Sequence, residues 1–367
     1  MQTTSGAVRV ADKVRAARKL IESCISPHGM GIWASQGRYA NQLWTRDLAL
    51  AAAPALKLMG RLDVVGAHLD QLVQRQQPSG KISILFSDDP QKLLETKERE
   101  AVQKGKPGFI LLALKAQGIE DLSPWTKDSE FLFVKTMLEY PDAPMVTPTR
   151  LRHEAVEKAL AYSLSQTKNG LAQGAERRDT NVWLNDACLL SNNCLLYQAR
   201  KLNGLNDRSL LDFRCDIVFS FWTGTSYRDY LGVDTADTFG QALGVIYDVI
   251  PKERWPAVLE SFAKLHTPRG YLTNDCRPNP TTDEERELLK SMPQSFVLWP
   301  FIHGYAILAL LKMGERELAM QAFNEYTNLE GFWEFFDPKT GKGYGAQEQL
   351  WSACLYLIAA DALGINV

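Results

Sequence analysis

The stretch GFWEFFDPKTGKGYGAQEQLWSACLYL, residues 331–357, combines an isolated acidic side chain with several aromatic rings. Glu334 lies between Trp333 and Phe335, a polar turn follows, and an apolar helix begins near Leu350. Aromatic surroundings disfavour the ionised form of a carboxyl group, which is one way in which a fold prepares an acid or a base for catalysis near neutral pH. The pattern fits equally well a glutamate at a strand edge beside core aromatics.

The whole chain is long and apolar enough to bury a large core. It has 367 residues, of which 45% are hydrophobic, and a net charge of −2. It contains no block rich in lysine and arginine, so we expect neither nucleic acid nor an anionic membrane surface as a partner. The N-terminal residues MQTTSGAVRVADKVRAARK are charged and helical in pattern, with no apolar signal core.

The most hydrophobic run, FVLWPFIHGYAILALL (296–311), predicts a buried helix rather than a membrane span. It is short for a bilayer, and Pro300 and His303 interrupt it. The six cysteines form no Cys-x-x-Cys pair and have no metal-ligand spacing with the five histidines. We therefore expect buried thiols in a reducing, cytoplasmic compartment, and neither a metal nor a cofactor.

Helical periodicity dominates the sequence, and alternation of β-branched residues is scarce. Twelve helices are predicted, over residues 8–24, 47–60, 62–76, 128–140, 149–166, 180–202, 208–222, 236–249, 252–266, 295–313, 315–328 and 348–364. The joins after the second, sixth, eighth and tenth helices are short, whereas those after the odd-numbered helices are long. Such alternation predicts an all-α fold, an (α/α)6 barrel of six hairpins in a closed ring, with function at the long-loop end. An open α-solenoid is the alternative, although no sequence repeat is visible.

The most apolar helices of this ring should lie inside it. Residues 180–202 and 295–313 are apolar on most faces, whereas 252–266 and 315–328 are amphipathic and suit an outer layer. No interdomain linker stands out, so the whole chain, residues 1–367, is interpreted as a single domain. The stretch 78–127 contains the charged run QKLLETKEREAVQKGK, and we interpret it as an insertion at the rim that acts as a lid.

The first two long loops carry acidic residues where helices begin. Trp44, Arg46 and Asp47 close the first loop, and Asp128 closes the second. Each aspartate could cap the helix that follows it. Alternatively, Asp47 accepts hydrogen bonds from sugar hydroxyls, with Arg46 orienting it and Trp44 stacking on the sugar ring. The same two interpretations apply to Asp128.

The third long loop, NGLAQGAERRDTNVW, contains Glu176, Arg178, Asp179 and Trp183. An acid beside arginines is ordinarily an ion pair with a low pKa, which argues against an acid catalyst. If one arginine faces away, Asp179 at the mouth of an apolar inner helix becomes a proton donor.

The fourth long loop contains three aspartates, Asp229, Asp234 and Asp237, which could suggest calcium. Their spacing matches no EF-hand loop, so we expect helix capping and solvation of the rim instead.

Tryptophan is concentrated in the long loops. Eight of the nine tryptophans lie in them or within about one helical turn of them: Trp33, Trp44, Trp125, Trp183, Trp222, Trp299, Trp333 and Trp351. A purely structural role would scatter them among the helices. Sugar C–H faces stack on aromatic rings while carboxylates bind the hydroxyls, so the pattern predicts a site for a small carbohydrate.

Four segments resemble the (α/α)6-barrel glycoside hydrolases. They are WTRDLALAAAPALKLMGRLDVVGAHLDQLVQRQQPSGKI (44–82), TKDSEFLFV (126–134), GLAQGAERRDT (170–180) and FWEFFDPKTGKGYGAQEQLWSACLYL (332–357). The nearest groups are the debranching-type glucosidases, the processing-glucosidase and glycosylglycerate hydrolase group, and the neutral invertases. The segments follow the family's order over most of the chain, and the last is the most specific. This chain is shorter than most members and lacks their accessory β-domain.

The resemblance implies a hydrolase of a small glycoside, such as an α-glucoside, that acts with inversion. In these enzymes the acid lies between the fifth and sixth helices and the base between the eleventh and twelfth. Those positions hold Asp179 and Glu334 here, with Glu176 or Asp128 as alternative proton donors and Asp47 at the sugar hydroxyls. Inversion places the two carboxyls about 6.5–9.5 Å apart. Neither the sugar nor the oligomeric state is predicted.

Glu334 can stay ionised among aromatic rings only if it is hydrogen-bonded. We expect loop amides, Tyr344 or an arginine to supply this partner. Two other functions remain open. A sugar epimerase or lyase on the same ring would need a histidine or tyrosine base, and His303 lies near a loop-side helix end. A non-catalytic carbohydrate-binding protein would keep the tryptophans and have no need of Glu334.

Overall fold

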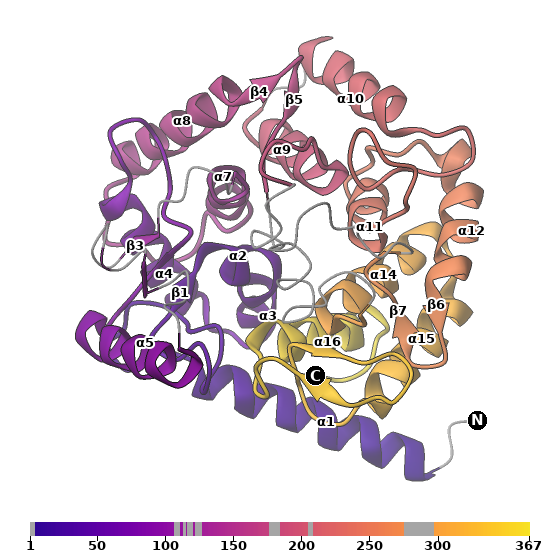
Figure 1. Ribbon diagram of the computed structural model, residues 1–367, viewed down its shortest axis with the longest axis horizontal. Helices are drawn as coiled ribbons and strands as arrows, with labels where there is room; N and C mark the ends of the chain where they lie inside the picture. The colour runs from indigo at the N-terminus through magenta and orange to yellow at the C-terminus, as the bar shows by residue number, and fades with distance from the viewer. Residues whose placement is uncertain are drawn as a thin grey trace.

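The computed structural model describes residues 4–105, 111–112, 115, 120–121, 127–175, 184–204, 208–274 and 297–367, and it is mostly helical. Its helices form two concentric layers around a common axis (Figure 1). Inner and outer helices alternate along the chain, so each hairpin contributes one helix to each layer. The closed all-α ring predicted from the sequence is confirmed.

In the described part of the chain, six helical rods form the inner layer. The first is continuous through α2 (Thr45–Asp47), the π-helical segment η1 (Leu48–Ala52) and α3 (Ala53–Leu58). The others are α7 (Ser129–Glu139), α9 (Leu190–Leu202), α11 (Thr238–Ile246), α14 (Pro300–Met313) and α16 (Leu350–Ala362). Most of their side chains are buried on all sides, which is why they occupy the middle. Packing of α16 against η1 and α3 closes the ring.

The outer layer consists of amphipathic helices. They are α1 (Thr4–Ser23), α4 (Leu62–Arg75), α8 (Thr149–Ser165), α10 (Arg208–Phe221), α12 (Trp255–Leu265, preceded by the 3-10 turn η3, Lys252–Arg254) and α15 (Arg316–Asn328). In α12, for example, Val258, Phe262 and Leu265 are buried, whereas Glu260 and Lys264 form an ion pair on the exposed side.

The first inner rod widens into its π-helical segment immediately after Asp47. Pro54 follows in α3 and has no N–H to donate to the carbonyl of Leu50. The hydroxyl of Tyr305 on α14 donates to that carbonyl at 2.7 Å instead. A π-helical segment often marks a functional site, and here it directly follows a candidate site residue.

The long connections lie side by side at one end of the ring. Isolated backbone bridges join successive connections, namely Ser35 with Gln349, Leu298 with Phe336, Asp237 with Asn274, and Leu189 with Tyr230. Each bridge links loops that precede different inner helices. The N-terminal ends of the inner helices therefore share one face of the molecule, which is the end where the sequence predicts function.

Small antiparallel sheets stiffen these connections in the described residues. One has three strands, β1 (Leu43–Trp44), β2 (Leu85–Phe86) and β3 (Glu120–Asp121). Three are hairpins, β4 (Thr167–Lys168) with β5 (Leu171–Ala172), β6 (His266–Thr267) with β7 (Gly270–Tyr271), and β8 (Phe335–Phe336) with β9 (Gly343–Tyr344). In the last hairpin Phe335 pairs with Tyr344, and Phe336 pairs with Gly343.

Two inner helices begin well after their predicted starts. The helix predicted over 295–313 is α14, which begins at Pro300, and the helix predicted over 180–202 is α9, which begins at Leu190. The backbone of Leu189 pairs with Tyr230, and the N–H of Leu190 donates to the carbonyl of Asp229, so this stretch is fixed to a neighbouring loop before the helix starts. Residues 180–183 of the prediction lie outside the described residues.

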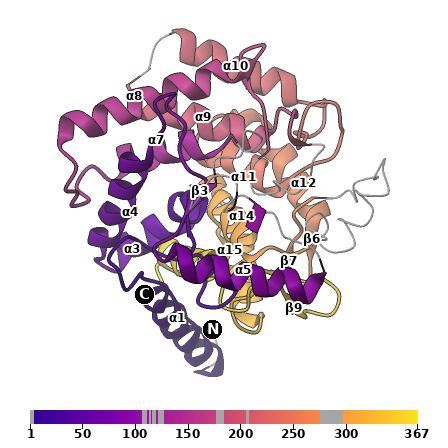
Figure 2. The same ribbon diagram turned by 60° about the vertical axis from the view of Figure 1, so that its left-hand side comes forward.

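A further helix, α5 (Pro90–Lys104), occupies the charged run within 78–127. Asp89 caps it by accepting a hydrogen bond from the N–H of Lys92 at 3.1 Å. This helix stands at the edge of the ring in Figure 1 and comes forward in Figure 2. Much of 106–126 lies outside the described residues.

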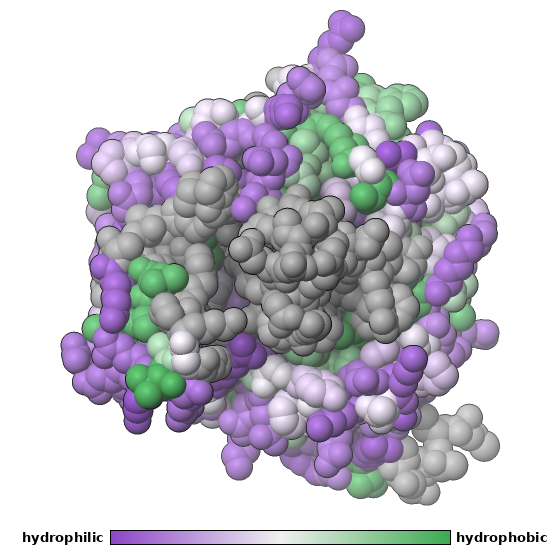
Figure 3. All heavy atoms as spheres, in the orientation of Figure 1, coloured by the Kyte–Doolittle hydropathy of each residue, from purple (hydrophilic) through white to green (hydrophobic). Residues whose placement is uncertain are grey.

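The margin of the face shown in Figure 3 is mostly hydrophilic, with a few hydrophobic patches. Among the helices that the structure describes, none combines the length and hydrophobicity that a bilayer crossing requires.

Candidate active site

The β8–β9 hairpin positions Glu334 directly before its first strand. The backbone N–H of Glu334 donates to the carbonyl of Ala346 at 2.7 Å, and the N–H of Ala346 donates to Oε2 of Glu334 at 2.9 Å. The polar turn of the hairpin is closed by Asp337, whose Oδ1 accepts from the N–H groups of Lys339 and Thr340. The carboxyl group is therefore fixed by backbone on both sides of the hairpin.

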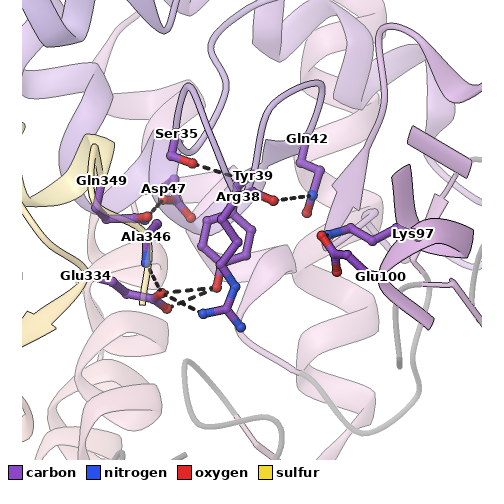
Figure 4. A network of polar contacts seen from close by, with 10 residues as sticks. All are labelled: Ser35, Arg38, Tyr39, Gln42, Asp47, Lys97, Glu100, Glu334, Ala346 and Gln349. Atoms are coloured by element: carbon purple, nitrogen blue, oxygen red, sulfur yellow. Dashed lines mark hydrogen bonds and ion pairs between the residues drawn. The ribbon is translucent and has the colours of Figure 1, made fainter. Parts of the chain in front are cut away.

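Two side chains of the first long loop reach Glu334. The hydroxyl of Tyr39 lies 3.1 Å from Oε1 and 3.3 Å from Oε2, and Nη1 of Arg38 lies 3.5 Å from Oε2 (Figure 4). Burial raises the pKa of the Glu334 carboxyl, whereas Arg38, the amide of Ala346 and the phenol of Tyr39 lower it. The predicted amide and arginine partners are confirmed. Tyr344 is not a partner, because it is 41% exposed and stacks on Phe335.

Glycine is required at two positions of this hairpin. Gly345 has a φ of +79°, and a Cβ there would collide with the carboxylate of Glu334. A Cβ at Gly343 would collide with the indole of Trp333. These two glycines thus make room for the carboxylate and for the neighbouring ring.

Asp47 lies on the opposite side of the same group of side chains. It is buried, and its Oδ1 accepts a hydrogen bond from Nε2 of Gln349 at 3.3 Å (Figure 4). Burial raises the pKa of Asp47 to about 8; the charge of Arg46 lowers it, and the charge of Glu334 raises it further. Asp47 and Glu334 therefore form an electrostatically coupled pair of carboxyl groups.

The capping interpretation is wrong for Asp47 and Asp128, since neither side chain caps a helix. Both oxygens of Asp128 instead bind Arg46, with Nε to Oδ2 at 2.6 Å and Nη2 to Oδ1 at 3.1 Å. Asp237 does cap its helix, because its Oδ2 accepts from the N–H of Gly240 at 2.6 Å. The capping prediction made for the fourth loop is thus confirmed at Asp237.

Aromatic side chains cluster at the N-terminal ends of α14 and α16. Trp351 stacks on Phe301, with ring centroids 4.4 Å apart, and meets Trp299 edge-on at 5.6 Å. The backbone pairing of Leu298 with Phe336 places Trp299 next to the strand that follows Glu334. Trp44 meets the ring of Tyr39 edge-on.

Several buried polar atoms at this end of the inner helices have no hydrogen-bond partner within the structure as described. They are Oγ of Ser129 and Ser191, Oδ1 of Asn192, Oε1 of Gln349, and Nε1 of Trp299 and Trp351. Buried donors and acceptors are costly to leave unsatisfied, and they are rare in folded proteins. Their gathering around one end of the ring suits a ligand that carries many hydroxyl groups.

The structure brings some of the predicted residues together. The charge of Glu334 acts on Asp47, Arg46 binds Asp128, and Trp299 meets Trp351. Their role as a site stays a prediction. Asp179, Glu176, Arg178 and Trp183 lie outside the described residues, so the facing of Asp179 and Glu334 stays a prediction.

Sequence reasoning missed Tyr39, Arg38 and Gln349 as site residues. Gln349 stands in the most specific segment, in the pattern Gln-x-Trp-Ser-Ala, and its position directly before an apolar helix was a usable signal. Tyr39 and Arg38 stand in the first long loop without any local pattern that distinguishes them from other loop residues.

His303 is a satisfied core residue. Its Nδ1 accepts from the N–H of Tyr271 at 3.2 Å, and its Nε2 lies 2.8 Å from the carbonyl of Ala322. Burial lowers its pKa to about 4. Across the described part of the chain, no three or more histidine, cysteine, aspartate or glutamate side chains gather as metal ligands would.

Solved structures share the fold of this protein over nearly the whole chain. A wild-type glycosidase matches with a TM-score of 0.66 and 14% identity, covering 99% of both chains. A mannosylglycerate hydrolase from Thermus thermophilus, in complex with glucose, matches with a TM-score of 0.61 and 13% identity over 94% of this chain and 99% of that one. A rhamnosidase from Klebsiella oxytoca with rhamnose bound matches with a TM-score of 0.63 and 14% identity over 97% of this chain and 64% of that one. By sequence, neither a family model nor a characterised protein matches the chain.

Proposed function

We propose that this protein, whose chain has the six-hairpin glycosidase fold, is a glycoside hydrolase with Glu334 as its general base. The observation that carries the proposal is the set of contacts on Glu334. Burial raises the pKa of this carboxyl, while Tyr39 and the amide of Ala346 stabilise its ionised form. A carboxylate balanced in this way can take a proton from water near neutral pH.

The proton donor in this proposal is Asp179, and the reaction inverts the anomeric carbon. Asp179 protonates the glycosidic oxygen while Glu334 activates a water on the opposite face, with the two carboxyls about 6.5–9.5 Å apart. Glu176 is the alternative donor. Two forms of the similar glycosidase each carry a glutamate replaced by alanine, which favours testing Glu176 beside Asp179. Asp128 is not proposed as the donor, because Arg46 occupies both of its oxygens.

The proposed substrate is a small glycoside, with an α-glucoside as the first choice. Asp47 and Gln349 offer a carboxyl and an amide oxygen to sugar hydroxyls, and Trp299 and Trp351 offer buried indole N–H groups. Two of the similar structures are solved in complex with glucose, and a third has rhamnose bound. These ligands support a hexose or deoxyhexose at the candidate site of this chain.

We propose that the whole chain is a single domain. The insertion 78–127 is proposed to border the candidate site within it. Lys97 and Glu100 of α5 stand near Arg38 in Figure 4, and the charge of Glu100 helps to raise the pKa of Arg38. We place the reaction in the cytoplasm, where the thiols of Cys24, Cys194 and Cys354, free and buried in this structure, remain reduced.

An epimerase or lyase is less well supported. His303, the histidine predicted to lie near a loop-side helix end, uses both ring nitrogens on the backbone and is held neutral by burial. A carbohydrate-binding protein would not need an ionised glutamate held by three partners.

The test is hydrolysis of a panel of α-glucosides, sucrose and glycosylglycerates, followed by NMR of the released anomer. With an α-glucoside, inversion releases the β-anomer first. Glu334→Gln and Asp179→Asn should each lower turnover by roughly 10²–10⁴-fold, the usual contribution of a general acid or base, while the melting temperature stays near that of the wild type. Near-native turnover of Glu334→Gln would reject Glu334 as the general base. Glu176→Gln distinguishes between the two candidate donors, because the variant of the true donor should lose turnover and the other should not.

A further inference from the structure

The helical rod that carries Asp47 is held in place on both sides of its π-helical segment η1. Before Asp47, the hydroxyl of Thr45 donates to the carbonyl of Ser83 at 2.6 Å, and the N–H of Thr45 donates to the carbonyl of Ile84 at 3.0 Å. Beyond η1, α3 is packed against α16 and α4. Neither end of the rod is therefore free to turn about the rod axis.

Between these ends, η1 holds one residue more than an α-helical turn would. The N–H of Ala53 donates to the carbonyl of Leu48, five positions earlier in the chain, whereas an α-helix pairs residues four apart. Pro54 has no N–H, so the carbonyl of Leu50 lacks the donor that an α-helix would supply. The hydroxyl of Tyr305 on α14 donates to this carbonyl at 2.7 Å, from 255 positions away in the chain.

The hydroxyl of Tyr305 has a fixed place because aromatic neighbours hold its ring. The ring meets Phe239 of α11 edge-on, with centroids 5.1 Å apart, and meets Phe301 edge-on at 6.5 Å. Burial raises the pKa of the phenol well above its ordinary value, so the phenol is uncharged near neutral pH. Tyr305 therefore acts on the rod through its hydrogen bond and not through a charge.

We propose that Tyr305 is a positioning residue, whose hydroxyl holds the Leu50 carbonyl, keeps η1 directly behind Asp47 and so directs the Asp47 carboxyl toward the candidate site. This inference rests on the proposed function, because it assigns a sugar hydroxyl to Asp47. If η1 relaxed to an α-helix, Asp47 would turn by about 100° around the rod relative to α3. Its hydrogen bond from Gln349, at 3.3 Å, would then be lost.

Tyr305→Phe tests this role, because it removes the hydroxyl and keeps the ring. A buried carbonyl without a donor is costly, so η1 should rearrange. Asp47 then leaves the position in which burial and the charge of Glu334 raise its pKa to about 8. The substitution removes no charge, since the phenol is neutral. A change in the pKa of Asp47 therefore reports where its carboxyl lies.

The experiment is a carboxyl NMR titration of protein labelled with ¹³C-aspartate, with the Asp47 signal identified by its loss in Asp47→Asn. We expect the Asp47 midpoint of Tyr305→Phe to lie at least about one pH unit below that of the wild type. Tyr356→Phe is the matched control, because this buried tyrosine of α16 contacts Oγ1 of Thr327 on α15 through its hydroxyl, at 3.0 Å. It should lose stability and leave the midpoint unchanged. An unchanged or raised midpoint in Tyr305→Phe, or equal shifts in both variants, overturns the proposal.

A double variant, Tyr305→Phe with Pro54→Ala, keeps the test decisive if the single variant folds poorly. It supplies an N–H at position 54 that can donate to the carbonyl of Leu50 in an α-helical turn. Its melting temperature should therefore lie above that of Tyr305→Phe. The Asp47 midpoint should stay low, because the α-helical turn does not restore η1. A wild-type midpoint in the double variant would contradict a role exerted through η1.

Binding of glucose, measured by calorimetry, is the second readout. We expect Tyr305→Phe to weaken it about tenfold or more, as loss of a hydrogen bond to a charged group typically does, and Tyr356→Phe to bind like the wild type. Equal affinity in Tyr305→Phe and the wild type would also overturn the proposal. If the wild type itself does not bind glucose, the proposed function is at fault, and the Asp47 midpoints, which are measured without any sugar, still decide whether Tyr305 positions Asp47.

Discussion

The phenol of Tyr39 bridges both carboxylate oxygens of Glu334, at 3.1 and 3.3 Å, although the two residues are 295 positions apart. The first and last long loops therefore build the candidate base together. Burial raises the pKa of Glu334, and the phenol is one of three groups that lower it.

Tyr39→Phe should shift the acidic limb of the activity profile to higher pH. It removes a hydrogen bond to the ionised form of Glu334, and such bonds contribute about 1.5–3 kcal/mol. That energy corresponds to a rise of about one to two units in the pKa of Glu334. The measurement is kcat/KM against pH. Tyr344→Phe, which changes an exposed phenol on the same hairpin, should leave the profile in place. An unshifted limb in Tyr39→Phe would show that the contact does not stabilise the carboxylate.

Gly345→Ala should abolish most activity without unfolding the protein. Its Cβ would press against the carboxylate of Glu334, and displacement of a catalytic group by about 1 Å can cost 100-fold in rate. Gly341→Ala is the matched control. It has a similar φ of +75°, but its Cβ would meet the guanidinium end of Arg269, which can move. Both variants should lose about 1–2 kcal/mol of stability through strain. Equal activity losses in the two would contradict the steric argument.

Asp47→Asn should be more stable than the wild type at pH 8, and this advantage should be smaller at pH 4. The folded pKa of about 8 lies above the ordinary value of 3.8, so the folded state binds the extra proton between these values. The contribution of the Asp47 carboxyl to the free energy of unfolding of the wild type is fully present below about pH 4 and is lost as the pH rises toward 8. Asparagine cannot ionise and still accepts from Gln349. The variant's advantage at pH 8 should be on the order of 1 kcal/mol or more, or about 2 °C in Tm. Melting curves at both pH values check it; an advantage independent of pH would refute the assignment.

Lys13→Met should destabilise the fold and leave the turnover of the folded protein unchanged. The ammonium of Lys13 on α1 donates to the carbonyls of Tyr326 at 2.7 Å and Leu329 at 2.6 Å, at the C-terminal end of α15. Methionine keeps the length of the side chain and leaves these carbonyls without their donor, which should cost about 1–3 kcal/mol. Denaturant unfolding gives the free energy. Lys19→Met, on the exposed side of the same helix, should cost much less, and comparable losses would contradict the capping role of Lys13.

The fold was predictable because its signals are local and repeated. Apolar helices such as 295–313 belong in the middle of a ring, and the alternation of short and long joins places the loops at one end. Glu334 and Asp47 were selected as candidates for a related reason, since each stands in a tryptophan-containing loop just before an inner helix or its hairpin.

The contacts between loops were not predictable in the same way. Asp128 and Asp237 both stand directly before a helix, yet one binds Arg46 and the other caps α11. Which contact each aspartate makes depends on the side chain that the helical ring places opposite it, and no local sequence pattern encodes this neighbour. The start of α9 was misplaced for the same reason, because a neighbouring loop holds the backbone of Leu189.

The bridge between Ser35 and Gln349 has a consequence for synthesis on the ribosome. Tyr39 and Asp47 are translated well before their partners, since Glu334 follows Tyr39 by 295 positions and Gln349 follows Asp47 by 302. Contacts between such distant segments form late, after the intervening chain has been ordered. The first long loop of a nascent chain therefore lacks these partners until the intervening residues have been made, and Glu334 meets Tyr39 only when the β8–β9 hairpin docks beside that loop.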